Sequence, residues 1–197
     1  MQEFIVSTLE DENDGNHDAG DLSLREAISL SNEQEGADTI TFDSNLSGGT
    51  IILNSGELLI DKSLNIEGLG TENLTIDAGD AASVFNLNDG DAETKIDVSL
   101  EELTITGGNF TEQNSVTSGT TQGGIINREN LALSNSNVTD NDTGIYNLDA
   151  SITINNSHID DNTSGSGLWN DGSNITINSS TINNNYGPDA GISAIDS

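Results

Sequence analysis

Short triplets in which one polar residue separates two aliphatic residues recur along most of this chain. The pattern places the two aliphatic side chains on one face of a strand and the polar side chain on the other. Turn-forming Gly, Asn, Asp and Ser residues lie between the triplets, so each triplet predicts a short strand. We expect the clearest examples to be rungs of one sheet: Leu64–Ile66, Leu74–Ile76, Leu103–Ile105, Leu131–Leu133, Ile152–Ile154 and Ile175–Ile177.

A longer repeat organises the C-terminal part of the chain. A Gly-aliphatic-x-Asn block occurs at residues 124–127, 144–147 and 167–170. The block that follows it begins at Leu131, then 21 residues later at Ile152, and then 23 residues later at Ile175. Short strands repeating at a period of about 22 residues are typical of a solenoid. The sequence therefore predicts an all-β fold, a parallel β-helix over residues 38–197, with a protruding loop at 109–121.

The first 37 residues follow a different pattern, and we expect them to form an N-terminal cap. Glu3–Ser7 predicts a strand. Ser23, followed three residues later by Glu26, has the spacing of a capping box, and apolar residues then line one side of a short helix over residues 23–32. Stacked repeats leave apolar interior exposed at their ends, so this helix is expected to cover the first repeat.

Net charge limits the classes of partner. The 197 residues include 34 Asp and Glu against four Lys and Arg, a formal net charge of -30. Such a surface repels nucleic acids and anionic membranes and suits cations or a salty environment. There is no cysteine, which excludes disulfides and thiolate chemistry. No apolar run is long enough to span a membrane, and export would need a signal outside this sequence.

An acidic segment at Glu10–Asp21 is the candidate metal site. It carries six acidic residues among twelve, and their spacing around Gly15 loosely resembles a calcium-binding EF-hand loop. The resemblance is incomplete, because the first position is Glu and the last is Asp. A solvated acidic turn and a calcium site both remain open as interpretations. The candidate calcium ligands are Asp11, Asp14, Asp18 and Asp21.

Tyr146 and Trp169 occupy the same position of the Gly-aliphatic-x-Asn block. Equivalent residues of adjacent repeats lie about 4.8 Å apart in a parallel sheet, so the two rings are expected to stack. They alternate with Ile145 and Leu168, which predicts that both rings face outward. We interpret the pair as a candidate ligand-binding platform for sugars; the alternative is a stack that only stabilises the sheet.

Two sets of polar residues recur at equivalent turn positions. Stacked Asn side chains donate and accept hydrogen bonds from one repeat to the next and satisfy turn backbone groups. We expect internal ladders, and a carbohydrate-binding row is the alternative. The first set is Asn135, Asn156 and Ser179, and the second is Asn141, Asn162 and Asn185.

The segment Leu22–Ile28 resembles the CSLREA motif found near the N-terminus of large bacterial surface proteins that form right-handed parallel β-helices. Residues 36–42, 49–53 and 64–68 are also similar to that family, and the later blocks are similar to repeats of polymorphic outer-membrane proteins and related adhesins. One departure is that Leu22 stands where the family motif has cysteine. The resemblance implies a right-handed, three-faced β-helix, an extracellular or cell-surface location and a mostly unassigned role, and it does not imply an enzyme. The capping helix is expected to persist, since a leucine can still pack.

These patterns favour a non-catalytic, secreted or cell-surface structural or adhesive module. We expect it to be the N-terminal part of a larger bacterial protein. Its expected partners are glycans or matrix and cell-surface proteins. Calcium is the one cofactor anticipated, and no catalytic residues are assigned. An alternative is a filament subunit that self-associates through the C-terminal end, because no closing cap follows residue 191.

A polysaccharide lyase is the less favoured alternative. Such an enzyme needs a base beside clustered carboxylates. Arg128, which precedes Glu129, is the best candidate base, and His158 is a second one that is expected to point outward. The spacing indicates no basic residue that recurs at matching positions of neighbouring repeats.

Overall fold

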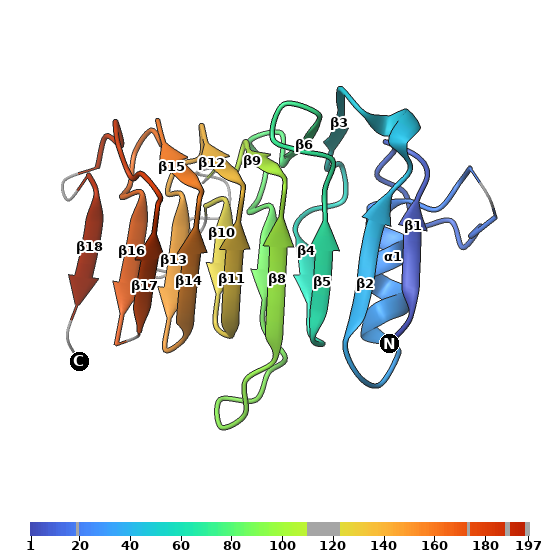
Figure 1. The fold of residues 1–197 in the computed structure, drawn as a ribbon, viewed down its shortest axis with the longest axis horizontal. Coiled ribbons are helices and arrows are strands. Elements are labelled where there is room, and N and C mark those ends of the chain that lie inside the picture. Colours follow the sequence, from blue (N-terminus) through green and yellow to red (C-terminus); the bar gives the residue numbers. More distant parts are fainter. Residues whose placement is uncertain (19, 110–122, 173, 188–189, 196–197) are drawn as a thin grey trace.

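The computed structural model describes residues 1–18, 20–109, 123–172, 174–187 and 190–195. The chain is mostly β, and its strands stack in three parallel sheets, which we name sheets A, B and C (Figure 1). Sheet A contains, in spatial order, β1 (Glu3–Val6), β2 (Asp38–Phe42), β5 (Leu64–Glu67), β8 (Asp97–Glu101), β11 (Asn130–Ser134), β14 (Ser151–Asn155) and β17 (Ile175–Asn178). The expected protruding loop at 109–121 lies almost wholly outside the described residues.

The other two sheets run beside sheet A and contain the strands that connect its rungs. Sheet B contains β3 (Gly49–Ile52), β6 (Leu74–Asp77), β9 (Thr104–Thr106), β12 (Asn137–Thr139) and β15 (His158–Asp160). Sheet C contains β4 (Leu58–Ile60), β7 (Phe85–Leu87), β10 (Ile125–Asn127), β13 (Ile145–Leu148), β16 (Leu168–Asp171) and β18 (Ile192–Ile195). A short 3-10 helix, η1 (Ser44–Leu46), joins β2 to β3.

From β2 to β16 the chain visits sheets A, B and C in turn, and we call one such round a coil. Strands β5, β6 and β7 form one coil, for example, and β8, β9 and β10 form the next. Each strand pairs in parallel with its equivalents in the neighbouring coils. This arrangement is compatible with the parallel β-helix that the repeat period predicts.

Aliphatic side chains aligned from coil to coil build the core. In sheet A, the register pairs Ile40 with Ile66, Ile66 with Leu100, Leu100 with Leu133, and Leu133 with Ile154. All five side chains are fully buried. Burying such a side chain stabilises a fold by about 1.5–3 kcal/mol, so the aligned rows supply much of the driving force for stacking.

The expectation that all six triplets share one sheet was wrong for two of them. Leu74–Ile76 lies on β6, and residues 103–105 lie at the start of β9, both in sheet B. The other four triplets are rungs of sheet A, where β8 lies between β5 and β11. Alternation of apolar and polar residues specifies which side of a strand is buried, but it is the same for every sheet.

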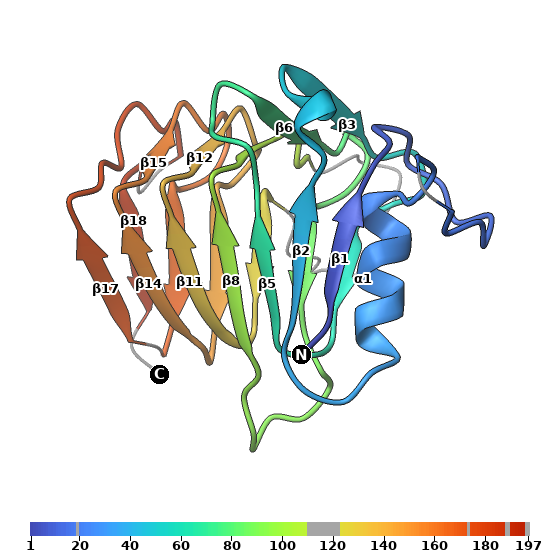
Figure 2. The same ribbon diagram turned by 45° about the vertical axis from the view of Figure 1, so that its right-hand side comes forward.

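Helix α1 (Leu24–Asn32) covers the N-terminal end of the stack (Figure 2). The predicted capping box is confirmed: the Ser23 hydroxyl accepts from the Glu26 N–H, and the Glu26 carboxylate accepts from the Ser23 N–H. The helix buries Leu24, Ala27 and Ile28 against β1, β2 and β4. Leu22, at the position of the family's cysteine, is also buried in this core.

The opposite end of the stack is more exposed. Ile177 of β17 is aligned with Ile154 of β14, yet Ile177 is 36% exposed whereas Ile154 is 0% exposed. Ile192 of β18 is also exposed. Within the described residues, β17 pairs on one side only, with β14.

Candidate functional site

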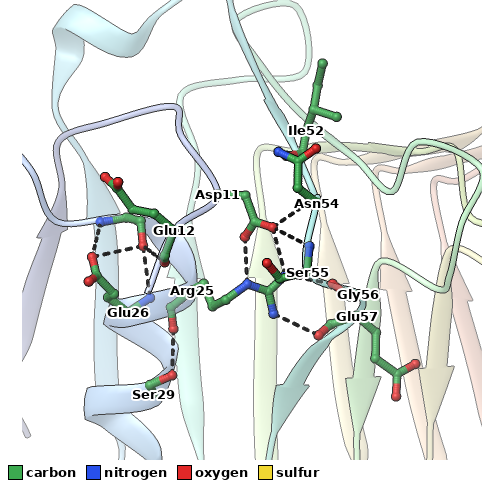
Figure 3. Close-up of polar contacts among 11 residues, drawn as sticks. Asp11, Glu12, Arg25, Glu26, Ser29, Ile52, Asn54, Ser55, Gly56 and Glu57 are labelled. Carbon is green, nitrogen blue, oxygen red and sulfur yellow. Dashed lines mark hydrogen bonds and ion pairs between the residues drawn. The ribbon is translucent and has the colours of Figure 1, made fainter. Parts of the chain in front are cut away.

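The acidic segment is anchored to the rest of the fold through Asp11. The Asp11 carboxylate forms an ion pair with Arg25 of α1, with 2.7 Å between Oδ1 and Nε. Asp11 Oδ2 also accepts from the backbone N–H groups of Asn54 and Ser55, in the turn between β3 and β4 (Figure 3). The Asp11 side chain is 1% exposed. Both of its oxygens are therefore engaged by protein donors.

Arg25 continues the connection from α1 to the first coil. Its guanidinium donates to the carbonyl oxygens of Gly56 and Glu57, as well as to Asp11 (Figure 3). Beside it, the buried Glu26 carboxylate accepts from the backbone N–H of Gly15. The acidic loop, the helix and the first coil are thus joined by hydrogen bonds within the protein.

The remaining calcium candidates lie at the exposed part of the loop. Asp14 Oδ1 accepts from the backbone N–H of Asn16, and Asp21 accepts from the Asn16 side chain. Partial burial and the nearby carboxylates of Asp21 and Asp14 raise the pKa of Glu12 above its ordinary value. Among the described residues, no group of three or more His, Asp or Glu side chains is placed to hold a metal ion. The calcium site at Asp11, Asp14, Asp18 and Asp21 and its alternative, a solvated acidic turn, both stay predictions.

Tyr146 and Trp169 are directly aligned in sheet C, as expected. Their ring centroids are 5.5 Å apart and the ring planes are inclined at 53°, so the rings form a tilted pair, not a parallel stack. Ile145 and Leu168 are fully buried while both rings are partly exposed, which places the rings on the outer face of the sheet. They extend an outward row whose earlier members are Leu59, Asn86 and Ile126.

A pocket of about 430 Å³ lies at the corner where sheet C turns into sheet A. Two of the four basic residues of the chain, Lys95 and Arg128, line it. A third, Lys62, lies in the corresponding turn of the preceding coil, between β4 and β5. The expectation that basic residues do not recur was therefore wrong: Lys62, Lys95 and Arg128 occupy the same corner in three successive coils. Sequence spacing hid this because the β7–β8 loop is longer than the other two turns.

Glu129 beside this pocket is buried and has a structural role. Its Oε1 accepts from the Asp89 N–H and its Oε2 from the Ile96 N–H, which ties both ends of the β7–β8 loop to the next coil. Burial raises the pKa of the Glu129 carboxyl and outweighs these two donors, which lower it. A carboxylate that holds a loop through both oxygens is poorly placed to act as a catalytic base.

His158 is exposed on β15, as expected, and lies in sheet B, whereas Arg128 follows a strand of sheet C. The two lyase candidates therefore belong to different faces. His158 Nδ1 lies 2.7 Å from the Thr181 hydroxyl, which in turn donates to Asp160 at 3.2 Å. These contacts join one coil to the next.

The Asn ladder at positions 141, 162 and 185 is confirmed. Asn141 Nδ2 donates to Asn162 Oδ1 and Asn162 Nδ2 donates to Asn185 Oδ1, and all three residues are buried. The first set of turn positions is confirmed as equivalent by positive φ values of 50°, 48° and 51° at Asn135, Asn156 and Ser179.

A second buried ladder was missed. Asn127 Nδ2 donates to Asn147 Oδ1, and Asn147 Nδ2 donates to Asn170 Oδ1. The fixed Asn of the Gly-aliphatic-x-Asn block was the available signal, because a polar residue that recurs at a buried position of a strand needs partners of its own kind.

Comparisons with protein-family models, curated proteins and solved structures gave no match. No helix among the described residues is long and apolar enough to cross a membrane. Function must therefore be inferred from the site residues themselves.

Proposed function

We propose that this chain is a non-catalytic binding module, a right-handed parallel β-helix of the CSLREA-motif type that is secreted or displayed on a bacterial cell surface. The observation that carries the proposal is the outward, partly exposed pair of Tyr146 and Trp169 on sheet C. Paired aromatic faces on a polar surface are suited to the apolar faces of sugar rings. The ligand class is a glycan of a cell surface or matrix, and the stacked coils hold the platform rigidly.

Two arrangements support a binding role over a lyase. Both oxygens of Glu129 are taken up by backbone donors, and Arg128 and His158 lie on different faces. The two buried Asn ladders inside the stack join neighbouring coils and serve stability.

A glycan array tests the proposal. The full chain should bind at least one class of glycan, and replacing Tyr146→Ala together with Trp169→Ala should weaken that binding on the order of tenfold, because truncating an interface anchor costs more than 1 kcal/mol. Tyr186→Ala is the matched control, since Tyr186 is a 74% exposed aromatic outside the pair. Binding that survives the double substitution would refute the platform.

A second candidate function is self-association through β17. Ile177 is exposed where its equivalents are buried, and an unpaired strand edge with apolar side chains favours strand addition. Sedimentation velocity over a range of protein concentrations should then show assemblies that Ile177→Lys abolishes. Ile52→Lys is the control, because Ile52 is 50% exposed on the outer face of sheet B. A monomer at every concentration would remove this candidate.

A further inference from the structure

The pocket at the corner of sheets C and A joins three coils. The β7–β8 loop contributes Asp91 and Lys95, the turn after β10 contributes Arg128, and the end of β13 contributes Leu148 and Asp149. Figure 1 shows this loop projecting beyond the ends of the strands, below β8. The loop therefore forms one wall of a pocket whose other wall is the stack itself.

The two cations of the pocket are left without carboxylate partners. Lys95 Nζ donates to the carbonyl oxygen of Arg128 at 2.7 Å, and Arg128 Nη1 is buried with no hydrogen-bond partner among the described residues. Neither side chain is within ion-pair distance of an acidic residue in the described ranges. Arg25, in contrast, donates from all three of its guanidinium nitrogens. A buried donor without a partner costs about 1–3 kcal/mol, so this arrangement needs a compensating role.

The nearby carboxylates are turned toward backbone and hydroxyl donors. Asp89 Oδ1 accepts from the Asp91 N–H, and Asp91 accepts from the Glu93 N–H and the Thr94 hydroxyl. These two contacts hold the pKa of Asp91 below its ordinary value. Together with Glu129, these acids accept from donors of the loop. The charge of Lys95 also acts on the carboxyls of Asp91 and Glu129, whereas no carboxylate of the described residues forms an ion pair with Arg128.

The pocket and the aromatic pair share strand β13. Leu148 lies two residues after Tyr146 on β13, so both side chains face outward and are about 6.6 Å apart along the strand. Arg128 follows Asn127 of the adjacent strand, which is aligned with Asn147, the residue before Leu148, and both Arg128 and Leu148 line the pocket. A ligand on the two rings can therefore present a substituent to Arg128.

We infer that the pocket of Lys95 and Arg128 binds the carboxylate of an acidic sugar, a hexuronic acid, whose ring lies over Tyr146 and Trp169. A guanidinium matches the planar carboxylate with two parallel N–H···O bonds, and an adjacent ammonium adds a third donor. The ring contact rests on the proposed glycan-binding function, whereas the carboxylate contact is independent of it. At physiological salt the Debye length is about 8 Å, so distant carboxylates of the chain are screened while the pocket contacts persist.

The two arginines of the chain provide a direct test. In ¹⁵N-labelled full-length chain, the Nε–H signals of Arg25 and Arg128 are followed while sodium glucuronate is added at constant ionic strength. We expect a saturable shift of the Arg128 signal and none for Arg25, whose Nε is held by Asp11. The methyl ester of glucuronate, which keeps the ring and removes the charge, should shift Arg128 at least tenfold less at equal concentration. No shift at Arg128, parallel shifts of both arginines, or equal shifts with acid and ester would overturn the inference.

Matched variants separate this inference from the glycan platform. Arg128→Gln should abolish the preference for the acid over its ester, whereas Lys62→Gln, at the same corner but outside the pocket, should retain it. Unchanged circular dichroism would show that Arg128→Gln still folds. Tyr146→Ala with Trp169→Ala should weaken acid and ester alike. If the double substitution leaves the binding of acid and ester unchanged while glucuronate still shifts the Arg128 signal, the platform alone is refuted. If the double substitution weakens binding but the Arg128 signal does not shift, the carboxylate site alone is refuted.

Discussion

Asp11 and Arg25 form a buried ion pair that joins the acidic loop to the capping helix. The Asp11 side chain is 1% exposed and that of Arg25 is 13% exposed, and each also bonds the turn between β3 and β4. One pair of side chains therefore connects the acidic loop, the capping helix and the β3–β4 turn.

Removing Arg25 should strongly destabilise the chain. Arg25→Met leaves the buried Asp11 carboxylate without its cation, and breaking a buried pair costs about 3 kcal/mol or more. Urea unfolding followed by circular dichroism measures the loss. Glu35→Gln, a change at an exposed carboxylate next to the helix, should stay within about 0.5 kcal/mol of the original chain. Equal stability of both variants would show that the pair does not hold the cap.

Replacing Asn162 in the Asn ladder should lower the stability of the fold more than the change in side-chain volume suggests. Asn162→Leu keeps the size but leaves the backbone N–H of Asn141 and the carbonyl of Val138 without their partner. Each buried group left unpaired costs about 1–3 kcal/mol, so thermal unfolding should occur at a clearly lower temperature. Asn183→Ala, in an exposed turn position, is the control. A tolerated leucine would mean that the ladder adds little.

The contribution of Glu129 to the free energy of unfolding should decrease as pH rises. Its folded pKa lies above the unfolded value of about 4.5, so between these two values the folded chain binds more protons than the unfolded chain. The stabilisation from Glu129 is therefore complete below pH 4.5 and is lost as pH rises through the folded pKa. The unfolding free energy of the original chain minus that of Glu129→Gln, measured by urea titration from pH 4 to 7, should decrease. A flat or rising difference contradicts a raised pKa.

Calcium and sodium should have similar effects on thermal stability at matched ionic strength. The loop is already held by Arg25 and Glu26, and screening of a net charge of -30 stabilises the chain in either salt. Circular dichroism melts in Ca²⁺, in chelator and in NaCl measure this. A rise of the midpoint in Ca²⁺ alone, lost in a variant with Asp14→Asn and Asp21→Asn, would instead establish a calcium site in the loop.

The sequence by itself determined the local features. Ser23 and Glu26 specify the helix start, the alternating triplets specify which side of each strand is buried, and the repeat aligns Tyr146 with Trp169. These features depend on residues close in sequence or on an exact repeat, which is why they were predictable.

Only the tertiary structure decided which face each strand joined and which distant side chains met. The triplet at Leu74 lies in sheet B. Alternation alone could not predict this, because the strands of all three sheets share the same pattern. Asp11 met Arg25 because the acidic loop folds back onto α1 and the β3–β4 turn, and Lys95 met Arg128 because the corners of successive coils lie side by side. Charged residues pair according to their distance in the folded structure, and the length of the loop between them does not predict that distance.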